Sequence, residues 1–243
     1  ADTASERGQA QGAADTALER GQAQGVADTA AAGGQATGDE AQANHPVAGL
    51  AVPGGVGYVA RVVPGSRLGE REYAWEGILA HLLRTGFLWE RIRMKGGAYG
   101  AFALQNGTEA IFAMASYRDP NIAKTFEAFR DALASYSVEP PRMRDVELAI
   151  IGMIGSESRP MSPSQKNLVS LRRYLTGVTD EVRQRRRDAL LSAEPGDIAR
   201  VAENLRGRAA ERSSSCVIAS REALEAASRE IPALRQSVRD LPV

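Results

Sequence analysis

The sequence predicts an α+β domain with helices packed on one face of a largely antiparallel sheet. Short runs of β-branched and apolar residues, bounded by Gly and Pro, are typical of strands. Longer stretches with apolar residues three and four positions apart are typical of helices that bury one face. These patterns follow one another as strand, helix, hairpin, helices, strand and helix, an order that favours an α+β fold. The order of the strands within the sheet does not follow from the sequence.

Four runs are predicted strands. Residues 56–63 and 214–219 are β-branched and apolar, and the second run contains the single cysteine. Residues 99–104 and 108–116 form a predicted hairpin. The Asn-Gly pair at 106–107 lies between them and suits a tight turn with positive φ.

Helical spacing marks most of the remaining chain. Asp119 is a predicted N-cap with Pro120 at the first helical position, and Thr179 is predicted to cap a later helix. The predicted helices cover residues 73–83, 119–133, 142–154, 168–175, 179–191, 197–205 and a last stretch from 221.

Residues 1–45 differ from the rest of the chain. Residues 1–12, 14–25 and 27–38 are three copies of one tandem repeat. Each copy has Ala-Asp-Thr-Ala followed by a Gly-Gln-Ala motif. They contain almost no large apolar side chain that could offset the entropy of ordering the backbone. We therefore expect a disordered or linker segment at 1–45, and a separate α+β domain at 46–243.

Charge and composition exclude several classes of partner. The chain has 30 basic and 30 acidic residues, so no excess charge attracts a nucleic acid or an anionic membrane. The basic cluster at 183–187 lies between acidic residues without aromatic neighbours, which favours a solvated helix face. No apolar run approaches the roughly 20 residues of a membrane span. The sequence thus predicts neither a nucleic-acid nor a membrane partner and, without a targeting signal, a cytoplasmic location.

A catalytic centre is not expected in this chain. A zinc site needs His, Cys, Asp or Glu at spacings that bring them together. His45 and His81 are the only histidines and are separated by a strand and most of a helix, which favours a packed or edge position for His81. Cys216 lies in a predicted strand with no basic neighbour in the sequence to activate it. We therefore expect no metal or cofactor in this chain.

Residues 90–100, Glu-Arg-Ile-Arg-Met-Lys-Gly-Gly-Ala-Tyr-Gly, have two interpretations. The segment is typical of a helix end, with basic residues and a Gly-Gly terminator. Alternatively, its small residues let another backbone approach, while Arg93 and Tyr99 offer a guanidinium and a hydroxyl to that backbone's carbonyls.

Several motifs resemble one family in order and spacing. Residues 87–100, the Ser-Tyr-Arg-Asp-Pro motif at 116–120 with Lys-Thr at 124–125, and residues 149–154 carry the resemblance. They resemble the C-terminal domain of pitrilysin-type (insulinase family) zinc metallopeptidases of the presequence protease and falcilysin subfamily.

This resemblance implies an enzyme of four homologous domains, folded as two halves around a chamber that degrades short unfolded peptides. Zinc and its H-x-x-E-H motif belong to the N-terminal half, which is the implied partner of this chain together with the peptide substrate. Arg93 and Tyr99 fall on the two positions that contact the substrate backbone near the scissile bond. Lys95 departs from the family, which more often has an uncharged residue there.

Two functions remain open at this point. The chain is either the substrate-binding C-terminal domain of a zinc metalloendopeptidase, inactive without its zinc-bearing half, or a non-catalytic scaffold domain of the same fold. The presence of both Arg93 and Tyr99 favours the first, because a scaffold needs neither.

Overall fold

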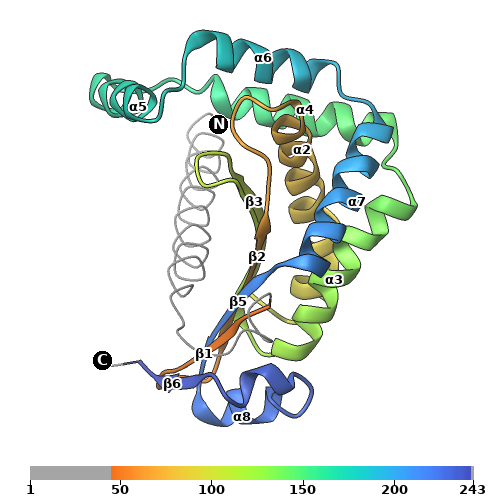
Figure 1. Ribbon diagram of the computed structural model, residues 1–243, viewed down its shortest axis with the longest axis vertical. Helices are drawn as coiled ribbons and strands as arrows, with labels where there is room; N and C mark the ends of the chain where they lie inside the picture. The colour runs from red at the N-terminus through yellow and green to blue at the C-terminus, as the bar shows by residue number, and fades with distance from the viewer. Residues whose placement is uncertain (1–44, 242–243) are drawn as a thin grey trace, which may run out of the picture.

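The computed structural model describes residues 45–241 and contains one six-stranded mixed sheet in the order β3-β4-β2-β5-β1-β6 (Figure 1). The pairs β3–β4, β4–β2 and β2–β5 are antiparallel, whereas β1 is parallel to both β5 and β6. The predicted α+β fold with a largely antiparallel sheet is therefore confirmed. Residues 1–44 of the predicted linker segment lie outside the described part. The strands are β1 (Val47–Ala51), β2 (Gly57–Pro64), β3 (Gly100–Asn106), β4 (Ile111–Asp119), β5 (Ser214–Ala219) and β6 (Val238–Asp240).

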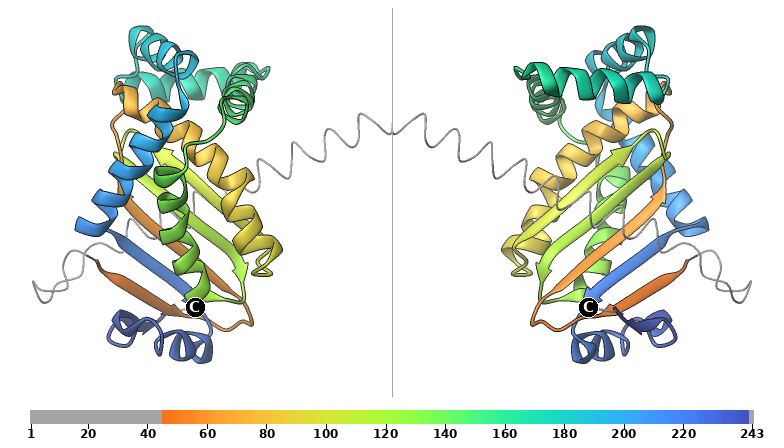
Figure 2. Two further views of the ribbon diagram at one scale, coloured as in Figure 1. Left: turned by 90° about the vertical axis from the view of Figure 1, so that its right-hand side faces the viewer. Right: turned by 90° about the vertical axis from the view of Figure 1, so that its left-hand side faces the viewer.

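Three helices, α2, α3 and α7, cover one face of the sheet, as predicted (Figures 1 and 2). Helices α4, α5 and α6 lie at one end of the sheet and α8 at the other (Figure 1). The helices are α2 (Arg71–Thr85), α3 (Ile122–Val138), α4 (Met143–Glu157), α5 (Pro163–Leu175), α6 (Asp180–Leu191), α7 (Pro195–Glu211) and α8 (Arg221–Ala227), with the π-helix η2 (Trp89–Met94) and the 3-10 helix η3 (Pro232–Leu234).

Successive side chains of a strand point to opposite sides of the sheet, so the two faces of the sheet carry different residues. On the helix side, Val59, Phe112 and Met114 are buried in one core with Ile78 of α2 and Phe129 of α3. The opposite face, which we call the open face, has no helix of residues 45–241 over it in the right-hand view of Figure 2. Its apolar cluster consists of Ala60, Val62, Phe102, Ala113, Ala115 and Cys216, with partly buried neighbours that include Tyr117.

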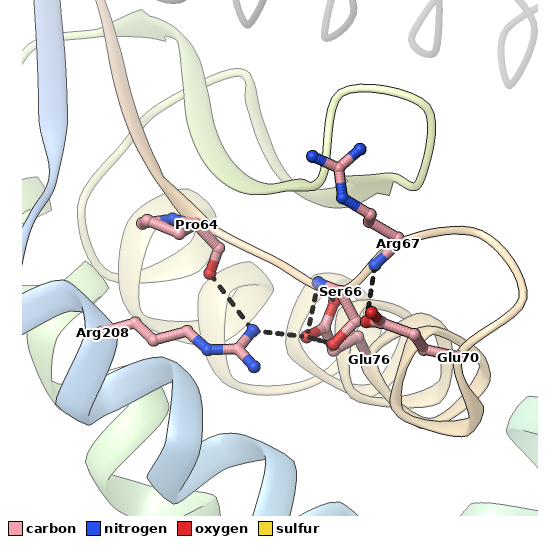
Figure 3. Close-up of polar contacts among 6 residues, drawn as sticks. All are labelled: Pro64, Ser66, Arg67, Glu70, Glu76 and Arg208. Atoms are coloured by element: carbon pink, nitrogen blue, oxygen red, sulfur yellow. Dashed lines mark hydrogen bonds and ion pairs between the residues drawn. The ribbon is translucent and has the colours of Figure 1, made fainter.

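A buried carboxylate joins the end of β2 to two helices (Figure 3). Glu76 of α2 is 1% exposed and accepts hydrogen bonds from the backbone N and the hydroxyl of Ser66, the latter at 2.7 Å. Arg208 of α7 lies 3.4 Å from the same carboxylate and also donates to the carbonyl oxygen of Pro64 at 3.5 Å. This cluster fixes the β2–α2 connection against α7.

Two local predictions are wrong. The hairpin turn covers the four residues between β3 and β4, and its positive φ is at Ala110 (54°), not in the Asn-Gly pair. Asn106 instead caps the turn, because its side-chain oxygen accepts from the backbone N of Thr108 at 3.0 Å. Helix α3 begins two residues later than predicted, since Asp119 ends β4 and Asn121 is the N-cap. The sequence reasoning also missed β1, β6 and the π-helix.

Candidate functional site

Arg93 and Tyr99 lie on either side of one short turn. Arg93 is in the last turn of the π-helix η2, and Tyr99 immediately precedes β3. Both side chains are exposed, Tyr99 to 60%. Backbone hydrogen bonds hold both ends of the turn: Gly97 N donates to Arg93 O at 3.1 Å, and Tyr99 N donates to Tyr117 O at 3.0 Å.

Glycines are required for this turn. A Cβ on Gly96 would lie 2.5 Å from the carbonyl oxygen of Ile92, and Gly97 has a φ of +77°. The π-helix η2, which precedes these glycines, ends with a hydrogen bond from Lys95 N to Glu90 O, five residues earlier, at 2.9 Å. The helix-end interpretation therefore accounts for the glycines, but it does not account for the exposed Arg93 and Tyr99.

A second motif holds the turn from the other side. The side-chain amide of Asn121 donates to the carbonyl oxygen of Gly96 at 2.6 Å. Asp119, 1% exposed, accepts from Asn121 N at 2.8 Å and from the hydroxyl of Thr125 at 2.5 Å. The sequence predicts Asp119 of the Tyr-Arg-Asp-Pro motif as a helix N-cap and assigns the motif no part in holding the turn. The structure shows that Asp119 and Asn121 fix the position of the turn.

Two further tyrosine rings extend in a row from Tyr99 along the open face. Tyr117 lies edge-to-face with Tyr99, at 5.7 Å between ring centroids, and with Tyr58 at 5.4 Å. Arg118 has a φ of 49°, and its guanidinium lies 5.5 Å from the centroid of the Tyr117 ring. No sequence pattern within one element could reveal this cluster, because its members come from three strands or their ends.

The Arg93 guanidinium is available to a ligand. It makes no hydrogen bond or ion pair with any other residue in the range 45–241, whereas Lys95 is bound to Glu90 at 2.6 Å. The hydrogen bond and charge of Lys95 lower the pKa of Glu90. Lys95 thus forms an exposed ion pair within its own helix and leaves Arg93 free.

The described residues do not fit a zinc ion. No group of three or more His, Cys, Asp or Glu side chains within residues 45–241 is arranged to hold a metal. His45 is hydrogen-bonded to Ser213 at 3.1 Å between Nδ1 and Oγ. His81 is half-buried, and its ring lies 3.1 Å from where a Cβ on Gly152 of α4 would be. Cys216 is buried, which raises the pKa of its thiol to about 11.

Between residues 45 and 241 no helix has the length and apolar character that crossing a bilayer requires.

Sequence comparisons point to one family. The family model described as "PreP C-terminal domain" matches residues 49–222. An uncharacterised protein of Borreliella burgdorferi is 34% identical over 62% of this chain, and presequence protease 1 of Arabidopsis thaliana, named chloroplastic/mitochondrial, is 32% identical over 74%. The mitochondrial presequence protease of Danio rerio is 32% identical over 62% of the chain. The matched part spans only 15%, 17% and 14% of these three relatives.

Solved structures share the fold. A peptidase M16 inactive domain from Pseudomonas fluorescens aligns with a TM-score of 0.57 at 12% identity, over 73% of this chain and 44% of that one. A protease from Helicobacter pylori aligns with a TM-score of 0.60 at 17% identity, over 72% and 43%. At these identities the likeness concerns the fold alone.

Proposed function

Since this chain belongs to the PreP C-terminal domain family, we propose that it supplies substrate-binding groups to a zinc metalloendopeptidase that degrades short unfolded peptides. The chain matches about a sixth of the length of its presequence protease relatives, so the active enzyme needs further domains. Zinc is expected in the N-terminal half, which carries the H-x-x-E-H motif in this subfamily. A cytoplasmic location stays a prediction, because several relatives are named mitochondrial.

The observation that carries this proposal is the pair Arg93 and Tyr99, exposed on one rigid turn. A guanidinium offers several N–H donors in a fixed plane, and a phenol offers one O–H donor, both suited to peptide carbonyl oxygens. Donors held in place before the substrate arrives stabilise negative charge that develops on a carbonyl oxygen. In this role the pair holds the peptide and assists the attack of a water activated in the other half.

Helix α5 offers a surface for that other half. None of its residues is buried, and it exposes Leu168, Leu171 and Leu175 along one stripe. It projects on the side of the open face (Figure 1). Residues 158–192 hold eight basic and three acidic side chains, so a partner with an apolar patch and an acidic rim is complementary. An uncovered helix of this length is marginal in water, which favours contact with the rest of the peptidase.

The alternative is a non-catalytic scaffold domain. The fold alone is compatible with this role, since a solved neighbour with the same fold is described as an inactive domain. A scaffold makes the opposite prediction for the exposed pair, since loss of either side chain would then leave peptide cleavage unchanged.

Cleavage by the reassembled enzyme tests the two functions. The chain is mixed with a companion polypeptide that carries H-x-x-E-H, and hydrolysis of an unfolded peptide is followed. Arg93→Ala is expected to lower kcat/KM about 100-fold with zinc content unchanged, as for loss of one preorganised donor. Tyr99→Phe removes the hydroxyl but keeps the ring and is expected to lower kcat as well. Arg144→Ala, an exposed arginine of α4, is the control for loss of one positive charge. Equal activity of parent, Arg93→Ala and Tyr99→Phe would favour the scaffold.

A further inference from the structure

We propose that Tyr58, Tyr99, Phe102 and Tyr117, which we call the aromatic ledge, form a subsite for one large apolar side chain of the bound peptide, an aromatic one above all. This inference rests on the proposed function, because the ledge shares Tyr99 with the peptide-contacting pair. It adds a substrate preference that Arg93 and Tyr99, acting on backbone carbonyls, cannot supply.

The ledge crosses three neighbouring strands at one end of the open face. Tyr58 is on β2, Tyr117 is on β4, and Tyr99 precedes Gly100, which pairs with Tyr117. The β2–β4 register shifts between Gly57 and Val59, so an irregularity in the ladder occurs at Tyr58. The rings meet edge-to-face at interplanar angles of 66° and 70°, the arrangement that aromatic quadrupoles favour.

Gly100 allows the fourth ring to join the other three. A Cβ on Gly100 would lie 2.8 Å from Cζ of Phe102 and 3.6 Å from Cβ of Tyr117. The Phe102 ring thus occupies the space that a side chain at position 100 would need. Phe102 is 6% exposed, whereas Tyr58 and Tyr117 are half-buried and Tyr99 is 60% exposed. The ledge therefore has a buried base and exposed ring surface around it.

The chemistry of the ledge favours an apolar ligand group. Its four members carry no charge, and Ala60 and Ala115 belong to the same apolar cluster as Phe102. The guanidinium of Arg118 lies 5.5 Å from the Tyr117 ring and would repel a lysine or arginine side chain of a peptide. The carboxylate of Asp119 is buried and accepts hydrogen bonds from Asn121 and Thr125.

The ledge is also placed where a peptide side chain must arrive. In an extended peptide, successive residues advance about 3.3 Å and their side chains alternate between two sides. A peptide with a carbonyl at Tyr99 therefore brings the side chain of an adjacent residue to the rings of Tyr99 and Tyr117. Arg118, next to Tyr117, has a positive φ, which is uncommon outside glycine. Such backbone strain is often found at binding sites, which agrees with a subsite here.

Peptide binding to the 243-residue chain tests the inference directly. The probes are two fluorescein-labelled, unstructured 15-residue peptides that are identical except for one central residue, Phe in one and Ser in the other. Binding is measured by fluorescence anisotropy. The Phe peptide is expected to bind about 10-fold more tightly, the gain typical of burying one large apolar side chain. Tyr58→Ala and Tyr117→Ala are expected to bring the ratio of the two affinities close to one, and Tyr117→Phe to preserve it, because the ring remains.

Arg93→Ala separates the subsite from the proposed function. It is expected to weaken both peptides by the same factor and to leave their ratio unchanged. An affinity ratio near one in the parent, or a ratio that survives Tyr58→Ala and Tyr117→Ala in folded protein, overturns the ledge while the effect of Arg93→Ala still supports the peptide-contacting pair. If neither peptide binds at millimolar concentration, both the ledge and the substrate-binding function of this chain are wrong. Circular dichroism confirms that each variant is folded.

Discussion

The side-chain amide of Asn121 donates a 2.6 Å hydrogen bond to the carbonyl oxygen of Gly96, 25 residues earlier in the chain. This bond ties the N-terminus of α3 to the turn that carries Arg93 and Tyr99. Because Asp119 in turn accepts from the backbone N of Asn121, the turn is held by a chain of hydrogen bonds that leads to a buried carboxylate.

Asn121→Asp is expected to lower kcat of the reassembled enzyme more than it raises KM. The substitution keeps the size of the side chain but removes the N–H donor, so the turn loses its restraint and the two substrate contacts lose their alignment. Stability should fall by about 1 kcal/mol, the typical contribution of one such bond. Steady-state kinetics and urea unfolding measure the two effects. Unchanged kinetics in a destabilised variant would assign Asn121 a purely structural role.

Gly96→Ala is expected to destabilise the fold by about 1–3 kcal/mol, because its Cβ would meet backbone atoms that cannot move aside cheaply. The nearest is the carbonyl oxygen of Ile92, at 2.5 Å. Gly207→Ala in α7 is the matched control, since nothing lies within 4 Å of its added Cβ. This control should stabilise the helix by up to about 1 kcal/mol. Urea midpoints of the two variants should therefore move in opposite directions from the parent.

Glu76→Gln is expected to change how stability depends on pH. Burial raises the pKa of Glu76, while the hydrogen bonds from Ser66 and the charge of Arg208 act in the opposite direction. Because the pKa is higher in the folded than in the unfolded state, the folded protein binds this proton more tightly. The stability that this proton provides is complete below the ordinary glutamate value of 4.5 and is lost as pH rises through the raised pKa.

The parent should therefore lose stability relative to Glu76→Gln as pH rises from about 4 to 7, whatever the offset between them at one pH. Urea unfolding at several pH values gives this difference. Glu147→Gln on the exposed side of α4 is the control and should run parallel to the parent. A parent that instead gains stability relative to Glu76→Gln as pH rises would show that the hydrogen bonds of Ser66 and the charge of Arg208 outweigh the effect of burial.

Cys216 is expected to resist alkylation in the folded chain. Its thiol is buried and has a pKa of about 11, so the reactive thiolate is scarce near neutral pH. Iodoacetamide at pH 8 should react at least about 100-fold more slowly with the native chain than with the chain in urea, where an ordinary cysteine pKa applies. Mass spectrometry follows the modification. Comparable rates in the two states would mean that the open face around Cys216 opens readily.

Local patterns in the sequence predicted most elements well. The strand at 214–219, the helix over 73–83 and the cap of α6 by Thr179 match the structure, because each has a clear signal in its local sequence. The sequence does not predict the two short strands β1 and β6, because they are extended only through pairing with distant segments. Strand β1 pairs with β5, and β6 pairs with β1. The hairpin turn was misplaced because Asn106 caps it with its side chain instead of adopting a positive φ.

The sequence by itself determined the fold class, the glycines of the turn and the two residues that flank it, since helix ends and tight turns are specified by residues close together in the chain. Only the tertiary structure decided what surrounds that turn. The register of β3 on β4 places Gly100 opposite Tyr117, and a slip of one residue would move Tyr117 to the helix side of the sheet. Strand register and the docking of α3 are set by packing between distant segments, so the Asn121–Gly96 bond and the aromatic ledge exist only in the folded chain.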